Sequence, residues 1–362
     1  MKRNIIKVCL TMLLAVSLSF SASAINPEYF TEEALEDVRI SEIIETKIES
    51  LGADISIQNI RHISDFDNNE YVVIECAPTG YFVLHPETSI ITEYSTGAIS
   101  PYADCSTSDD NLYYAGPTYY YEYDTENYEH TVLDEEMSTS EVECAKELCA
   151  EFVDELEAEE NTAVVACLSG EADASGLATT SSAAAKVDFW VTNYSWIKNR
   201  TSGFGYKDGG YCGYIAANLL LKYHNYCGNL SLPSKYATIN STALTNALIS
   251  YGSGASTTGV SIESVINKFC AANNLKQLAV WAAGVYGVDT EIYSHKRPSI
   301  LFGNLPNGNG GKTNHAVLVY GCNVYENTDL TTYVVHYGWN GYSEVHICSN
   351  NSIFGTNTKY KI

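Results

Sequence analysis

Cysteine and histidine are the residues of this chain whose types and spacing favour covalent chemistry. Cys212 lies at the start of an expected helix, because Gly209 and Gly210 break regular structure before it and apolar residues recur at helical spacing after it. Backbone amides at a helix N-terminus stabilise an anion, so a cysteine there is expected to have a lowered pKa and to act as a nucleophile. The structural alternative is a cysteine that is simply buried at a helix start. Cys227 follows the same helix at the negative end of its dipole and is expected to be structural.

A base for Cys212 is expected to be close in space but distant in sequence, and His315 meets that requirement. It lies 103 residues later, after a Gly/Asn-rich segment at 303–314, and it opens the apolar run HAVLVYGC, which predicts a strand. A histidine at the mouth of a strand can project into a cleft and accept a thiol proton. Apart from His336, the other histidines are expected to be structural or surface groups.

Further short strands are expected after the helix that Cys212 begins. Residues 298–303, 332–336 and 344–348 are rich in β-branched and aromatic residues, and the last two flank the turn-forming sequence YGWNG at 337–341. The region therefore predicts a helical half led by Cys212 and a sheet half that contains His315.

The order of these motifs resembles the papain-like cysteine peptidases, in particular the bacterial branch of streptopain, staphopain and the double-glycine leader peptidases. The shared pattern is Cys-Gly at a helix start, a strand, a Gly-rich loop, Asn-His before a strand, and a second strand followed by GWxG. The resemblance covers residues 186–362. It implies a two-part α+β catalytic domain, a helical half plus an antiparallel sheet half, with Cys212 as nucleophile and His315 as general base. It implies no cofactor and no metal, and Trp339 falls at the second Trp of the N-W-G-W-G pattern of streptopain-like enzymes.

The chain departs from this family at the residue that orients the histidine. The family uses Asn or Asp, whereas the aligned residue here is His336. A neutral imidazole nitrogen can accept the ring N–H bond, so His336 is expected to orient His315. Asn340 and Asn314 are alternative orienters, and a strand histidine packed beside tyrosines is the structural alternative for His336.

A second departure concerns the site that stabilises the oxyanion. Tyr206 stands six residues before the nucleophile, where papain-like enzymes often have Gln. The backbone N–H of Cys212 can donate one hydrogen bond to an oxyanion. The second donor is expected from the Tyr206 hydroxyl, from Asn193 or from Asn199, and the sequence does not choose among them.

The first 24 residues have the pattern of a bacterial secretory signal peptide. Lys2, Arg3 and Lys7 precede an apolar run at 8–20, and Ala-Ser-Ala at 22–24 is a cleavage signal. We therefore expect a secreted chain, extracellular or associated with the cell wall, and no later stretch predicts a membrane span. Without Cys9, ten cysteines remain, which permit disulfides without requiring them, and none has the spacing of a zinc site.

The rest of the chain predicts a small α+β pro-domain at 25–101, a connecting region at 102–165, a Ser/Ala/Gly-rich linker at 166–186 and a catalytic domain at 187–362. The pro-domain is expected to consist of a helix and four strands, at 31–51, 54–64, 70–76, 80–85 and 89–94. Within the connecting region, residues 102–134 are dense in tyrosine. They are expected to form a connector over another domain, with an interaction surface as the alternative. Residues 138–160 predict an acidic helix with an apolar stripe of Cys144, Leu148, Phe152 and Leu156.

Charge divides the chain at the linker. Residues 1–185 carry 7 basic and 36 acidic side chains, whereas residues 186–362 carry 13 basic and 8 acidic ones, for a net charge of −24. A chain this acidic is a poor partner for nucleic acid. The sequence predicts a zymogen of a cysteine endopeptidase that acts on a protein or peptide, with the acidic pro-segment as an intramolecular partner.

Two other functions remain open on the sequence. One is a transglutaminase or cell-wall amidase that uses the same Cys–His chemistry. The other is a catalytically inactive papain-like surface binding protein, which His336 and Tyr206 favour because they depart from the usual catalytic pattern.

Overall fold

The computed structural model divides the chain into two units, residues 1–40 and residues 41–362. It describes residues 32–124, 126–133, 135–168, 186–207, 210–255, 257–304, 306–307, 311–312, 315–325, 331–348 and 353–362. The expected signal peptide and most of the expected linker lie outside these residues. Of the first unit, the structure describes the beginning of helix α2 (Glu32–Leu51). Within the second unit we call residues 41–168 the N-terminal half and residues 186–362 the C-terminal half.

The strands that follow α2 agree with the sequence prediction. They are β1 (Ser56–Ser64), β2 (Glu70–Ala77), β3 (Tyr81–His85) and β4 (Ile90–Ser95). They pair antiparallel in chain order. All of β3 and most of β2 are buried, which explains their almost continuous apolar sequences.

The tyrosine-rich segment differs from the connector that the sequence predicts. It contains η2 (Asp109–Asn111), β5 (Leu112–Tyr114), β6 (Tyr120–Asp124) and β7 (Asn127–His130). Strand β5 pairs parallel to β1, and β6 and β7 extend the sheet as antiparallel strands. Five of its tyrosines are at most 1% exposed, namely Tyr102, Tyr114, Tyr119, Tyr120 and Tyr121. Tyrosine can fill a core when its hydroxyl finds a hydrogen-bond partner, so much of this segment is core.

Helix α3 (Thr139–Leu168) is the expected acidic helix, and it continues beyond residue 160. At its start, the backbone N–H of Ser138 donates to the Glu141 carboxylate at 2.6 Å, which satisfies an amide that the helix leaves unpaired. Leu148, Phe152 and Leu156 are buried, as their spacing predicts.

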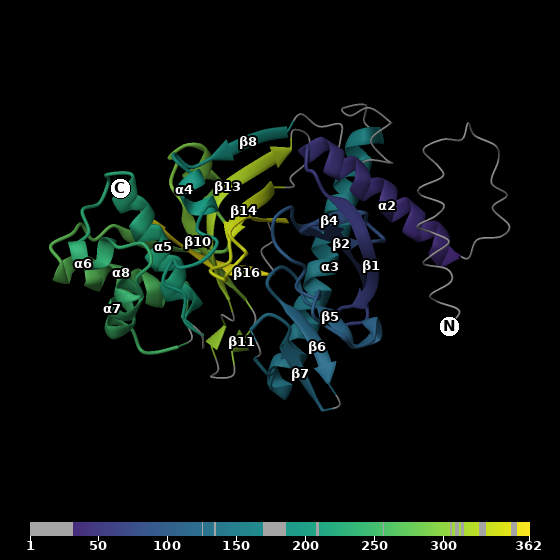
Figure 1. The fold of residues 1–362 in the computed structure, drawn as a ribbon, viewed down its shortest axis with the longest axis horizontal. Helices are drawn as coiled ribbons and strands as arrows, with labels where there is room; N and C mark the ends of the chain where they lie inside the picture. The colour runs from purple at the N-terminus through teal and green to yellow at the C-terminus, as the bar shows by residue number, and fades with distance from the viewer. Residues whose placement is uncertain are drawn as a thin grey trace. The chain divides into compact units, whose positions relative to one another are not determined.

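The C-terminal half contains a group of helices and a set of mainly antiparallel strands. The helices are α4 (Ser195–Lys198), α5 (Cys212–Tyr226), α6 (Ser234–Ala237), α7 (Ala243–Tyr251), α8 (Gly259–Ala272) and α9 (Val288–Tyr293). The strands are β8 (Lys186–Trp190), β9 (Ala279–Ala283), β10 (Ser299–Gly303), β11 (Pro306–Asn307), β12 (Gly311–Lys312), β13 (Ala316–Tyr325), β14 (Thr331–His336), β15 (Val345–Cys348) and β16 (Phe354–Tyr360). Helix α5 is buried along most of its length and packs against β10, β13, α7 and α8 (Figure 1). The chain is therefore α+β, as the sequence predicts.

One large mixed sheet runs through both halves. Its order is β7-β6-β5-β1-β2-β3-β4-β15-β14-β13-β10-β16-β9, with β8 paired to β13. The two halves meet where β4 pairs antiparallel with β15, so that Glu93 lies opposite Ile347. A single hydrophobic cluster includes buried residues of both halves.

Three further observations apply only to the part of the chain that the structure describes. No helix there is long and apolar enough to cross a bilayer. No disulfide joins the nine cysteines whose side chains the structure describes. No group of three or more His, Cys, Asp or Glu side chains is arranged there to hold a metal ion.

Candidate active site

Cys212 is the first residue of α5 and is half-buried. Close packing explains why a glycine, Gly213, follows Cys212. A Cβ atom at Gly213 would lie 2.0 Å from Oγ1 of Thr257, so only glycine lets the first turn of α5 approach residue 257 this closely. The Cys-Gly pair thus places the thiol at the N-terminus of a buried helix.

His315 lies directly before β13, as the sequence predicts. Its carbonyl oxygen accepts a hydrogen bond from Gly303 N–H at 2.7 Å, which ties it to the end of β10. In the β13–β14 ladder Leu318 lies opposite His336, and extending this register by three residues brings His315 opposite Trp339. The two rings are in contact, with centroids 4.5 Å apart.

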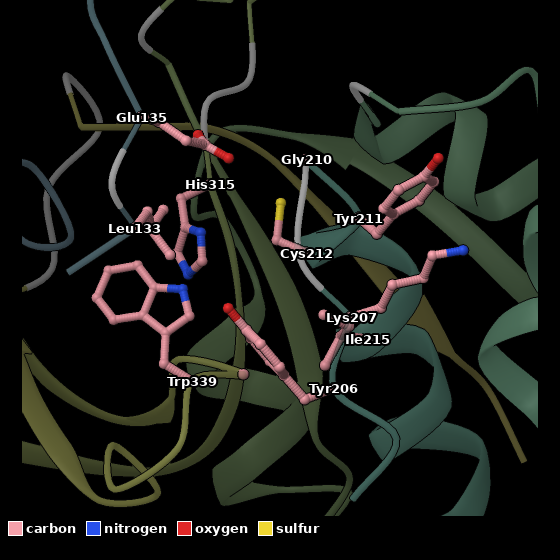
Figure 2. Close-up of a pocket in the computed structure, with 11 residues that line it drawn as sticks. Leu133, Glu135, Tyr206, Lys207, Gly210, Tyr211, Cys212, Ile215, His315 and Trp339 are labelled. Carbon is pink, nitrogen blue, oxygen red and sulfur yellow. The ribbon is translucent and has the colours of Figure 1, made fainter. Parts of the chain in front are cut away.

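The imidazole of His315 has a defined orientation. Its Nε2 lies 2.8 Å from the carbonyl oxygen of Tyr337, which can only accept a hydrogen bond, so Nε2 carries the proton in neutral His315. The nitrogen with the free lone pair is then Nδ1. Figure 2 shows the imidazole of His315 and the side chain of Cys212 facing each other across a pocket. This arrangement lets Nδ1 act as the base for the thiol.

His336 does not orient His315, in contrast to the sequence prediction. Its Nδ1 accepts a hydrogen bond from Gly338 N–H and its Nε2 donates to the carbonyl of Arg200, each at 2.8 Å. The ring is fully buried, and burial lowers its pKa to about 4. The register explains the difference, because it sets His336 opposite Leu318 rather than beside His315. Of the alternative orienters, Asn340 is exposed, and residue 314 lies outside the described residues.

Tyr206 is the candidate oxyanion donor that the structure brings to the pocket. It lines the pocket together with Cys212 and Trp339, and Figure 2 shows its hydroxyl directed into the space between them. Asn193 lies instead near Cys227 at the far end of α5, with 3.8 Å between Nδ2 and Sγ. Asn199 caps the C-terminus of α4 and does not line the pocket.

Two residues of the N-terminal half also line this pocket, Leu133 and Glu135. They belong to the turn after β7, and we call its described residues, 131–133, 135 and 136, the blocking loop. The free volume of the pocket is about 30 Å³, which holds water but not a peptide. No motif in the sequence marks Leu133 or Glu135, because their role depends on a contact between distant parts of the chain.

The blocking loop is organised around His130. The backbone N–H of His130 donates to the carbonyl of Glu135 at 2.8 Å, and its Nδ1 accepts from Val132 N–H at 3.2 Å. The ring is buried, and its centroid lies 5.5 Å from that of Trp339. The loop therefore rests on the same tryptophan that supports His315. The sequence predicts only a structural or surface role for His130.

Burial has the largest effect on the pKa values of Cys212 and His315. It raises the pKa of the Cys212 thiol to about 11. The backbone N–H groups of Ala316 and Gly213 lower that pKa, and the charge of Glu135 raises it. Burial also lowers the pKa of His315 to about 3, against the effect of its hydrogen bond to Tyr337. At neutral pH this state therefore contains a neutral thiol and a neutral imidazole. The helix-start amides act as the sequence predicts, but burial outweighs them.

Comparisons with known proteins give little for this chain. No known family and no curated protein matches its sequence. Among solved structures, it is similar to a fragment of prointerpain A from Prevotella intermedia that carries a cysteine-to-alanine mutation. The two share 13% sequence identity, with a TM-score of 0.36, over 84% of this chain and 99% of that one. A likeness this distant does not bear on the chemistry of the site.

Proposed function

We propose that this chain is the precursor of a secreted cysteine endopeptidase of the papain-like type. The observation that supports this function best is the pairing of Cys212 and His315. The thiol lies at a helix start, and the imidazole faces it with Nε2 held by a backbone carbonyl, so that Nδ1 is free to take the proton. Nucleophilic catalysis requires this arrangement of nucleophile, base and orienting group.

The proposed reaction follows from these positions. Nδ1 of His315 takes the proton of Cys212, and Sγ attacks the scissile carbonyl carbon. The backbone N–H of Cys212 and the hydroxyl of Tyr206 donate hydrogen bonds to the resulting oxyanion. The imidazolium then protonates the leaving amine, which departs, and water hydrolyses the thioester to release the acid and the free thiol.

The orienting group in this mechanism is the carbonyl of Tyr337. It accepts the Nε2–H bond before and after His315 takes the proton, so it fixes the ring as an Asn side chain would. A neutral carbonyl stabilises an imidazolium less than a carboxylate does. We therefore expect the thiolate–imidazolium pair to depend strongly on the helix-start amides and on release from the buried state.

The blocking loop accounts for latency in this proposal. Leu133 and Glu135 line the small pocket that contains Cys212 and narrow it in this proposal, and the charge of Glu135 opposes a thiolate there. Residues 25–185, which include the N-terminal half, carry 4 basic and 36 acidic side chains, so this part of the chain also has charge complementarity with the C-terminal half. Cutting the region 166–186 and removing the N-terminal half would open the pocket.

The test uses the chain from Ile25 onward, as wild type and as Cys212→Ala, under reducing conditions with an epoxide or iodoacetamide probe. Intact mass reports both cleavage and labelling. Loss of the N-terminal half together with a label on Cys212, in the wild type alone, supports a self-processing peptidase. If both chains stay whole, an outside protease cuts the linker and the probe is added again. A Cys212 that stays unreactive after removal of the N-terminal half refutes the proposal and favours a binding protein.

Two further assays separate the proposal from related chemistry. The processed chain is given a peptide library, an amine donor with a glutamine-containing protein, and purified peptidoglycan. Hydrolysis of peptides without amine incorporation or release of cell-wall fragments is the expected result. Amine incorporation or cell-wall release without peptide hydrolysis would replace the endopeptidase with a transglutaminase or an amidase.

A further inference from the structure

A carboxylate is fully buried at the joint between the two halves. Glu93 is a residue of β4, has 0% exposure and lies opposite Ile347 of β15. No lysine or arginine of the described residues forms an ion pair with it. A buried carboxylate without a cation is costly unless hydrogen bonds stabilise it, so its surroundings require an explanation.

Phenol groups supply those hydrogen bonds. The hydroxyls of Tyr81 and Tyr120 donate to Oε1 of Glu93, and that of Tyr114 donates to Oε2 at 3.4 Å. These donors come from β3, β6 and β5 of the N-terminal half. Tyr337, from the C-terminal half, reaches the carboxylate through Tyr120, whose hydroxyl lies 3.3 Å from its own, and it lowers the pKa of Glu93. Glu93 and these four tyrosines form what we call the carboxylate cluster.

The carboxylate cluster reaches the candidate active site through Tyr337. The hydroxyls of Tyr120 and Tyr337 lie 3.3 Å apart, and the carbonyl of the same Tyr337 accepts the Nε2–H bond of His315. The Tyr337 ring also contacts Trp339, with centroids 5.1 Å apart. The segment that orients His315 is thus bonded directly to the N-terminal half.

We propose that the carboxylate cluster is a latch that holds the N-terminal half against the C-terminal half, and that loss of a proton from Glu93 loosens it. The proposal rests on the proposed function only in that the N-terminal half must leave during activation. The cluster is suited to this role because four of its five side chains leave with the N-terminal half, while Tyr337 stays.

The direction of the pH effect follows from the burial of Glu93. Burial raises the pKa of Glu93 from 4.5 to about 7, although the four phenols lower it. In a separated half the carboxylate meets water, and its pKa returns toward the ordinary value. The docked state therefore binds the proton more tightly. Docking is strongest at low pH and weakens as the pH rises through about 7.

The other titratable groups that the charge of Glu93 affects are phenols, and they do not titrate between pH 5 and 8. Tyr102 and Tyr342 also feel its charge, and burial raises the pKa of each. The phenols of the cluster likewise have raised pKa values, because burial disfavours their charged form. These groups stay neutral between pH 5 and 8, so Glu93 is the member of the cluster that titrates there.

The test measures how tightly the two halves hold together once the chain between them is cut. A protease site is introduced within residues 169–185 of the full-length Cys212→Ala chain, and the folded protein is cut there. The dissociation constant of the two pieces is then measured between pH 5 and 8 by gel filtration and surface binding. Cys212→Ala removes any peptidase activity, so the outcome does not depend on the proposed reaction.

Four versions of this chain are compared. In the parent, we expect the dissociation constant to rise at least tenfold between pH 5 and pH 8. Glu93→Gln keeps the shape and the hydrogen bonds but cannot ionise, so its constant should change far less. Tyr337→Phe removes a hydroxyl that lowers the pKa of Glu93, so it should steepen the pH dependence. Glu87→Gln, at an exposed glutamate after β3, is the matched control and should behave as the parent.

An equal pH dependence in the parent and in Glu93→Gln would overturn the proposal. If the two pieces stay together at every pH, amide exchange at residues 333–342 of the uncut chain makes the same comparison. Protection that falls from pH 5 to pH 8 in the parent but not in Glu93→Gln supports the latch. Protection that changes equally in both, after correction for intrinsic exchange, refutes it.

Discussion

Reaction of Cys212 with iodoacetamide should be slow in the intact chain, by a factor that its burial predicts. The reagent attacks the thiolate, and burial raises the pKa of Cys212 from 9.0 to about 11. At pH 8 the thiolate fraction is then about one hundredth of that of an unperturbed thiol. We expect alkylation at least about 100-fold slower than that of N-acetylcysteine amide, and slower still because the pocket lined by Leu133 and Glu135 is small.

Removal of the N-terminal half should make the alkylation of Cys212 faster. It takes away the charge of Glu135 and the burial that Leu133 and Glu135 contribute, which raise the pKa, and it leaves the amides of Ala316 and Gly213, which lower it. The pKa of Cys212 should then fall from about 11 toward its ordinary value. We therefore expect the rate at pH 8 to rise by about 100-fold or more after the linker is cut and the halves are separated.

The assay follows alkylation of the Cys212 peptide by mass spectrometry between pH 6 and 10. Intact mass confirms in each sample that the chain is whole or cut, and Cys212→Ala identifies the labelled peptide. The intact chain should react faster with each rise in pH up to the highest value. A rate in the intact chain that levels off below pH 9 would refute the account of burial. A rate that does not change on removal of the N-terminal half would refute the blocking loop.

Four substitutions examine the remaining parts of the site, the first three in the processed protein and the last in the full chain. His315→Ala should lower kcat for peptide hydrolysis by about 10²–10⁴-fold. His336→Gln should lower kcat far less, because His336 hydrogen-bonds only the backbone of Arg200 and Gly338. Tyr206→Phe removes a hydroxyl that acts on the oxyanion, so kcat should fall by about 10²–10³-fold with little change in KM. Gly213→Ala should destabilise the full chain by about 1–3 kcal/mol, seen as a lower Tm, because its Cβ would lie 2.0 Å from Thr257 Oγ1.

Specific outcomes would contradict each of these. Equal losses of kcat in His336→Gln and His315→Ala would show that His336 takes part in catalysis. A Tyr206→Phe variant with a normal kcat would remove its hydroxyl from the mechanism. Gly97→Ala is the control for Gly213→Ala, since a Cβ there meets nothing within 4 Å, and an equal loss of stability in both would refute the packing argument.

Local patterns in the sequence were sufficient for the elements that carry the site. The apolar spacing after Cys212 predicts α5, and the run after His315 predicts β13, because each pattern depends only on neighbouring residues. The roles of the surrounding residues depend on strand register and on contacts between distant segments. The register that sets His336 opposite Leu318 cannot be obtained from the spacing of motifs.

The tyrosine-rich segment shows a different limit of sequence reasoning. A run such as YYYEY at 119–123 has both apolar area and polar tips, so its composition fits a surface or a core equally well. What decides between them is a set of buried partners from other strands, such as Glu93 for the hydroxyl of Tyr120. The prediction of a lowered thiol pKa at Cys212 was wrong for a related reason, since burial in the folded chain outweighs the local effect of the helix-start amides.

The ladder between β4 and β15 has a consequence for the protein after activation. While the halves are together, β15 is an interior strand of the sheet, with β14 on one side and β4 on the other. Departure of the N-terminal half turns β15 into an edge strand and exposes a row of backbone N–H and C=O groups beside Ile347. Such an edge accepts a new strand, from a second copy or from an extended peptide. The cut that opens the pocket would therefore also expose an edge strand. Copies of the processed protein would tend to associate through it unless the edge is covered.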